Sequence, residues 1–390
     1  MESNRNQESI MNHSPYVFEG SSFEIGRQHA LMVVEKYEQA RQTLENSPYW
    51  QRLKKPWPWK ILQKLQGYYL ITLLQKQLDR VRPASDYLNG MLSVPEMKPS
   101  IYYFLLLSEV LGADRTRVVQ GCCGVGCKSG ESRLLGKNFD YQYPLAPYQG
   151  AIVRQEKSQF RYVAFSPVLM PFGGQFCVNE HGLAVSYNYA YYRKGNHPGG
   201  LPASYLVHDL CRSCQSAEEA VLRAKQRNYP IGNGASLAVV DSQDFYVVEV
   251  VGEKTGVVHS KSGLLNTNHF ISDELAPFNF PDSTRFSLQI PELEQLPILE
   301  SSYERLRKLR NRADRIHSLE TLQATLGEST DKNGMNNIFQ TGPFWGTISS
   351  YIFNVAEMTV YEFKDIRNGQ ATVYDLKTLL SSSSLICSQK

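Results

Sequence analysis

The run Gln120-Gly121-Cys122-Cys123-Gly124, followed by Leu135-Gly136-Lys137-Asn138-Phe139-Asp140, decides the fold of this chain. The first run sets a small residue and a thiol at the start of a predicted strand. The second passes through a predicted glycine turn at Gly136 and ends in a carboxylate eighteen positions after Cys122. A thiol that follows glycine, with an acid on the predicted neighbouring strand, indicates nucleophilic chemistry at Cys122.

Cys122 is the candidate nucleophile, and Gly121-Cys122 is the candidate site of self-cleavage. A thiolate is the reactive form of cysteine, and an adjacent amine or cation lowers the thiol pKa from about 8.5. Cleavage would free an α-amine with a pKa of about 8 beside the sulfur, so that no separate histidine base is required. On this hypothesis residues 1–121 become a separate chain and residues 122–390 form the catalytic core. The alternative is that Cys122 and Cys123 are small buried hydrophobic residues.

Four other residues are candidates for the site. Asp140 would position the Cys122 amine, or else cap a turn. Asn138 lies two residues earlier on the same face of a strand, where it would hold the substrate or a loop. Asn268 is the candidate oxyanion donor, although an isolated asparagine more often makes a turn. Arg305 would pair with Asp140 or with a substrate carboxylate, unless it is a solvated helix charge.

The pattern of apolar residues changes at about Gly121. Residues 22–110 show helical periodicity interrupted by prolines, which predicts a helical N-terminal segment. After Gly121, short β-rich runs alternate with helical runs over 203–212, 216–226, 300–315 and 318–326. Many strands are joined by turns too short for crossover helices, so the sheets should be largely antiparallel. The pattern predicts a layered α/β or α+β protein, with a surface loop over 272–289.

Composition argues against several classes of protein. A formal charge of +3 is too mild to indicate nucleic-acid binding. The longest apolar runs are far too short to span a membrane, and the polar N-terminus lacks a signal sequence. Seven cysteines argue against a disulfide framework and favour the cytoplasm. Cys211-x-x-Cys214 has no second pair that would complete a zinc site, so neither a metal nor an organic cofactor is expected.

These motifs, in their order and spacing, resemble the cysteine N-terminal-nucleophile (Ntn) hydrolases of the isopenicillin-N acyltransferase (acyl-CoA:6-aminopenicillanate acyltransferase-like) family. Bile-salt (choloylglycine) and penicillin V hydrolases are its more distant relatives. The matching motifs are Gly26-Arg27-Gln28-His29, Gly121-Cys122-Cys123, Gly136-Lys137-Asn138-Phe139-Asp140, Asn179–Val185 with Asn188, Thr267-Asn268-His269-Phe270, Ser302-x-x-Arg305, and Thr347–Ser350 with Thr359–Tyr361.

The resemblance implies an α+β fold, a four-layer αββα sandwich with a helical N-terminal pro-segment. It implies hydrolysis or acyl transfer at linear amide (C–N) bonds through an acyl-thioester on Cys122, with Asn188 among the supporting residues. The expected partners are a small acyl or amide substrate, with acyl-CoA or an amine acceptor as candidates, and the cleaved N-terminal chain itself.

Two departures from the family leave alternatives open. Cys123 stands where the family usually has Thr or Ser, so it is a competing candidate nucleophile. Lys137 stands where the bile-salt branch has arginine, which favours the acyltransferase branch. Two other functions also stay open. One is a catalytically silent binding or structural member of the fold with an uncut chain, and the other is a thiol protease with His269 or His181 as base.

Overall fold

A computed structural model describes the chain in its uncut form, over residues 14–46, 69, 71–97, 121–193, 197, 199–286, 296–330, 334–342 and 345–381. Residues 47–68, 70 and 98–110 of the predicted helical segment and the end of the predicted loop over 272–289 lie outside these residues. Within the described part of the chain, no helix is long and apolar enough to cross a membrane.

The first of two sheets has eight strands in the spatial order β1-β4-β5-β6-β7-β8-β9-β10. Neighbouring strands are antiparallel, except that β1 runs parallel to β4. The bounds are β1 (Tyr16–Gly20), β4 (Gln149–Glu156), β5 (Tyr162–Pro167), β6 (Phe176–Asn179), β7 (Ala184–Tyr189), β8 (Ile231–Val240), β9 (Phe245–Gly252) and β10 (Lys254–Ser260).

The second sheet has six strands in the order β11-β2-β3-β12-β13-β14, all antiparallel to their neighbours. The bounds are β11 (Gly263–Asn266), β2 (Gly121–Ser129), β3 (Ser132–Gln142), β12 (Trp345–Asn354), β13 (Thr359–Phe363) and β14 (Thr372–Asp375). The inner faces of the two sheets pack together through β2 against β7 and β8, and through β11 against β9. The prediction of largely antiparallel sheets is confirmed.

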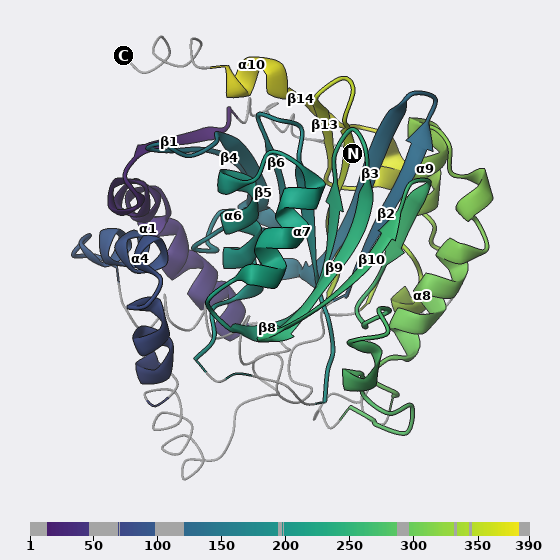
Figure 1. Cartoon of the computed structure of the whole chain (residues 1–390), viewed down its shortest axis with the longest axis horizontal. Coiled ribbons are helices and arrows are strands. Elements are labelled where there is room, and N and C mark those ends of the chain that lie inside the picture. Colours follow the sequence, from purple (N-terminus) through teal and green to yellow (C-terminus); the bar gives the residue numbers. More distant parts are fainter. Residues whose placement is uncertain are drawn as a thin grey trace, which may run out of the picture.

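Helices cover both outer faces and complete four layers, αββα (Figure 1). The eight-stranded sheet is covered by α1 (Ser22–Asn46), α4 (Arg82–Leu92), α6 (Ala203–Ser213) and α7 (Ala217–Gln226). The six-stranded sheet is covered by α8 (Glu300–Arg310) and α9 (Leu319–Leu326), and a short α10 (Leu376–Leu380) follows β14. The predicted α+β sandwich is confirmed.

One local prediction is wrong: Gly136 is not in a turn. It lies inside β3 and pairs with Val125, and the chain turns at Gly130, whose φ is +59°. Glycine at 136 leaves room for the side chains of α9 to pack closely against the strand. A Cβ there would lie 2.8 Å from a side-chain carbon of Leu326. Asp140 is accordingly also within the strand, and it does not cap a turn.

The N-terminal segment is built into the sandwich. Its strand β1, which the helical prediction missed, adds an edge to the eight-stranded sheet. A Cβ on Gly26 would lie 1.9 Å from the carbonyl oxygen of Tyr87, so this glycine lets α1 and α4 pack closely. The fully buried His29 donates from Nε2 to the carbonyl oxygen of Val168, 2.6 Å away. The Gly-x-x-His motif therefore joins α1 to α4 and to the core.

Candidate active site

Pairing of β2 with β3 decides which way the two adjacent cysteines face. Cys122 pairs with Phe139, and both lie in the apolar cluster between the two sheets. Cys123 pairs with Asn138 and lies in a smaller apolar cluster beneath α8 and α9. Because side chains alternate along a strand, the two thiols lie on opposite faces of the same sheet.

The backbone of Cys122 is held by Asn268 and Arg305. The amide N–H of Cys122 donates to Asn268 Oδ1 at 2.9 Å, and Arg305 Nη1 donates to the carbonyl oxygen of Cys122 at 2.5 Å. Arg305 Nη2 also donates to Asn268 Oδ1 at 2.6 Å, which closes a three-residue network. Arg305 is only 2% exposed, so it is a buried group of the site and not a solvated helix charge.

The side-chain amide of Asn268 is oriented by its partners. Its Nδ2 donates to the carbonyl oxygen of Tyr189 at 2.7 Å, and its backbone N–H donates to Ser302 Oγ at 2.8 Å. One N–H of Nδ2 is thus used by the fold, and the second is the hydrogen available to a developing oxyanion. The sequence analysis named Asn268 as a candidate, but it did not predict the hydrogen bond between Asn268 and the Cys122 amide.

Asp140 lies beside Gly121, on the face of β3 that points away from the Cys122 side chain. Its Oδ1 accepts from Thr347 Oγ1 at 2.6 Å, and its buried Oδ2 has no hydrogen-bond partner among the described residues. Burial raises the pKa of Asp140 to about 6, although Arg305 and Thr347 both act to lower it. The direct Asp140–Arg305 pair that the sequence suggested is thus a longer-range electrostatic interaction.

We expect ionised Asp140 to destabilise the uncut fold. Its folded-state pKa of about 6 exceeds the ordinary 3.8, so its stabilising contribution is complete below about pH 3.8 and is lost as pH rises through about 6. Two variants that lack the proposed nucleophile, Cys122→Ala and Cys122→Ala/Asp140→Asn, test this. Between about pH 4 and about pH 7.5, the free energy of unfolding should fall by about 2 kcal/mol more in the first variant than in the second. Urea unfolding measures this difference, and identical pH dependence in both proteins would contradict the raised pKa.

Lys137 is a site residue that sequence reasoning treated only as a departure from the bile-salt branch. It is fully buried between the sheets, where Nζ donates to Asn188 Oδ1 at 3.0 Å and to the carbonyl oxygen of Tyr187. Burial raises the pKa of the Cys122 thiol, and the Lys137 cation is the strongest influence that lowers it. The alternation of side chains along a strand could have placed Lys137 in the site, since Lys137 and Phe139 lie on the face of the sheet that carries Cys122.

Asn188 and Asn138 have structural partners. Asn188 Oδ1 accepts from Lys137, and its Nδ2 donates to the carbonyl oxygen of Asn266 at 3.3 Å. Asn138 donates through Nδ2 to the carbonyl oxygens of Leu326 and Ile338, at 2.8 and 2.9 Å. Of the two roles suggested for Asn138, its contacts are those of a residue that holds a loop.

The alternative catalytic groups lie in unsuitable places. Burial and Arg305 lower the pKa of His269 to about 3, and its Nδ1 is 2.7 Å from Ser302 Oγ. His181 is exposed beside the turn between β6 and β7. Burial and the charge of Asp140 raise the pKa of the Cys123 thiol to about 12. These environments favour Cys122 over Cys123, and an amine over an imidazole base.

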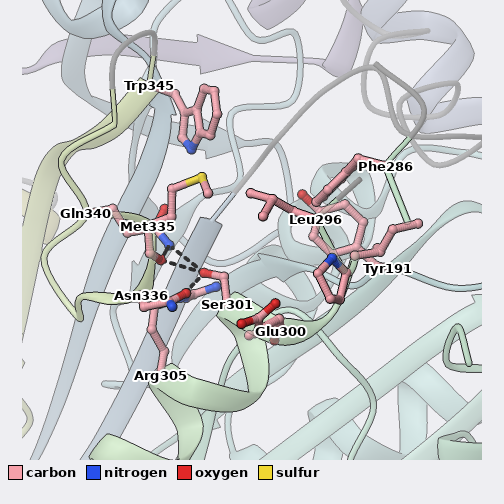
Figure 2. Close-up of a pocket in the computed structure, with 13 residues that line it drawn as sticks. Tyr191, Phe286, Leu296, Glu300, Ser301, Arg305, Met335, Asn336, Gln340 and Trp345 are labelled. Atoms are coloured by element: carbon pink, nitrogen blue, oxygen red, sulfur yellow. Dashed lines mark hydrogen bonds between the residues drawn. The ribbon is translucent and has the colours of Figure 1, made fainter. Parts of the chain in front are cut away.

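A small cavity of about 50 Å³ adjoins the Cys122 network. Arg305 and Gln340 line it on the side of the network, and the rest of the lining is largely apolar, including Tyr191, Phe286, Leu296, Met335 and Trp345 (Figure 2). At this volume it holds a few water molecules at most in the uncut chain.

Comparisons with known proteins place the chain in a family. Residues 127–365, more than half of the chain, match the family described as acyl-coenzyme A:6-aminopenicillanic acid acyl-transferase. This region contains Asp140, Asn268 and Arg305, and begins just after Cys122. No curated protein matches the chain.

Solved structures also resemble the chain. A mutant of conjugated bile acid hydrolase from Clostridium perfringens is 14% identical with a TM-score of 0.42, over 66% of this chain and 92% of that one. Penicillin V acylase from Agrobacterium tumefaciens is 12% identical with a TM-score of 0.45, over 67% and 89% of the two chains.

Proposed function

Because the chain belongs to the acyl-coenzyme A:6-aminopenicillanic acid acyl-transferase family, we propose that it is a self-processing amidohydrolase or N-acyltransferase whose nucleophile is Cys122. The observation that carries this proposal is the hydrogen-bond network around the Cys122 backbone. Asn268 accepts from its N–H and Arg305 donates to its carbonyl, while burial raises the pKa of its thiol and the Lys137 cation opposes that rise. A purely structural cysteine would also need partners for its buried backbone N–H and carbonyl, but it would not need a buried lysine on the side of its thiol.

Self-cleavage would proceed through a thioester. The Cys122 sulfur attacks the Gly121 carbonyl carbon, an S–C bond forms, and the C–N bond to Cys122 breaks as its nitrogen takes up the thiol proton. Water then hydrolyses the thioester, which leaves a carboxylate on Gly121 and returns the thiol. Asn268 Oδ1 accepts from the nitrogen that becomes the leaving amine, so it would hold this group in place through both steps.

In the mature enzyme the free α-amine of Cys122 would act as the base for its own thiol. The thiolate attacks an amide carbonyl, the leaving amine receives the proton, and an acyl-thioester remains on the sulfur. The second N–H of Asn268 Nδ2 and a backbone N–H would hold the oxyanion. Transfer of the acyl group to water or to an amine gives hydrolysis or acyl transfer, with an acyl-CoA as a candidate donor. Asp140 would position the α-amine.

The cleaved N-terminal chain should stay bound. Strand β1 pairs with β4 along its whole length, and α1 and α4 cover the same sheet. The buried His29 contributes a hydrogen bond to Val168 of the catalytic part. We therefore propose that residues 1–121 form a permanent partner chain.

Trapping of the acyl-enzyme tests this function. Purified enzyme mixed with a panel of para-nitroanilides and quenched in acid should give a chain beginning at Cys122 whose mass is increased by the acyl group. An added amine acceptor that diverts the acyl group into a new amide identifies a transferase. A protein that stays uncut and acquires no acyl group from any donor would instead support the silent binding protein.

A further inference from the structure

The uncut chain shows where an acyl group binds, because Gly121 supplies the acyl carbonyl in self-cleavage. Two buried acceptors converge on its α-carbon. A Cβ built on Gly121 would lie 2.3 Å from Gln340 Oε1 and 2.7 Å from Asp140 Oδ2. Neither oxygen has a hydrogen-bond partner among the described residues. A methyl group at this position would press on both oxygens and offer them no hydrogen bond. An N–H or O–H there would donate to them once Gln340 Oε1 moves back by about 0.4 Å to hydrogen-bond distance.

The orientation of Gln340 is fixed by its other contacts. Its Nε2 donates to the carbonyl oxygen of Met335 at 2.8 Å and contacts Ser301 Oγ at 3.3 Å (Figure 2). Its backbone N–H donates to Thr347 Oγ1 at 2.9 Å, and the residue is 2% exposed. Since Nε2 is committed to Met335, Oε1 must face Gly121. The acceptor is therefore held in place and shielded from water.

We propose that Gln340 Oε1 accepts a hydrogen bond from a group on the α-carbon of the substrate acyl group. The enzyme would therefore select acyl groups that carry a hydrogen-bond donor on that carbon. The inference rests on the proposed function, because it places the substrate acyl group where Gly121 lies before cleavage. Hydroxyl and amino groups share the required chemistry.

The first test compares para-nitroanilides of four acyl groups: propionyl, isobutyryl, lactoyl and alanyl, the last two as both enantiomers. Isobutyryl, lactoyl and alanyl differ only in a methyl, hydroxyl or amino group on the α-carbon. We expect kcat/KM for lactoyl or alanyl to exceed that for isobutyryl by at least about tenfold. The length-matched Gln340→Met variant should lose this preference. Equal rates for all three substrates in the natural enzyme would overturn the inference, and so would a preference that Gln340→Met leaves intact.

A second test uses self-cleavage and needs no external substrate. Gly121→Ala should slow cleavage strongly, because its Cβ meets Gln340, and Gly121→Ala/Gln340→Ala should recover cleavage at least in part. Intact masses of both variants after timed expression measure this. A Gly121→Ala chain that cleaves as fast as the natural one, or a double variant no faster than the single, would overturn the role of Gln340. A natural chain that is never cut would overturn the proposed function itself, and the inference would fall with it.

Discussion

Replacement of Cys122 by alanine is expected to leave a single uncut chain and to lower amide turnover by about 10⁴–10⁶-fold. The sulfur is required twice in the proposed mechanism, first for attack on Gly121 and then for attack on the substrate. A lost nucleophile has no replacement nearby, because Cys123 faces the layer under α8 and α9. Release of nitroaniline from the best substrate of the panel measures the loss.

Cys123→Ala is the matched control, since both variants lose one buried thiol from the same strand. This variant should still be cleaved and should keep its rate to within about tenfold, because its thiol points away from Lys137 and has a pKa of about 12. If Cys123→Ala is inactive while Cys122→Ala turns over substrate, then Cys123 is the nucleophile and the assignment is wrong.

Asn268→Ala is expected to lower turnover by about 10²–10³-fold, the usual cost of one lost oxyanion donor. The same change removes the acceptor for the Cys122 nitrogen and leaves one N–H of the Arg305 guanidinium without its partner. Self-cleavage should slow as well, because the leaving amine is no longer held. Pre-steady-state release of nitroaniline separates the acylation step, where the loss should appear.

Asn266→Ala is the control for a general loss of packing. Asn266 lies two residues before Asn268, is fully buried, and donates through Nδ2 to Ser236. Both variants remove a buried amide from the same segment, but only Asn268 contacts Cys122. An Asn268→Ala enzyme that acylates as fast as Asn266→Ala would remove Asn268 from the mechanism.

The sequence predicted much of the sandwich because its strands alternate and its turns are short. The β-rich runs expected after Gly121 are present as strands in the structure, among them β8, β9 and β12. Strand β1 was missed because Tyr16–Gly20 is a short run without alternation, and it pairs with a strand more than a hundred residues away. Gly136 was misread because this glycine lies within β3, where it leaves room for α9, and not in a turn.

The sequence predicted several residues of the candidate site, but few of the contacts between them. Cys122, Asn268 and Arg305 come together as a network, but the pattern around Arg305 also fitted a solvated helix face. Strand alternation could place Lys137 on the face of Cys122, but its contacts and those of Gln340 could not be assigned from spacing. These contacts depend on sheet packing and on a segment more than two hundred residues from Cys122. Such contacts follow from tertiary structure and leave no local pattern in the sequence.

The most direct test of the central claim is the intact mass of freshly purified protein under denaturing conditions. The account predicts two chains that meet between Gly121 and Cys122, and a single chain for Cys122→Ala. A natural protein that persists as one chain of 44.3 kDa would contradict self-processing at Cys122, and with it the use of its α-amine as the catalytic base.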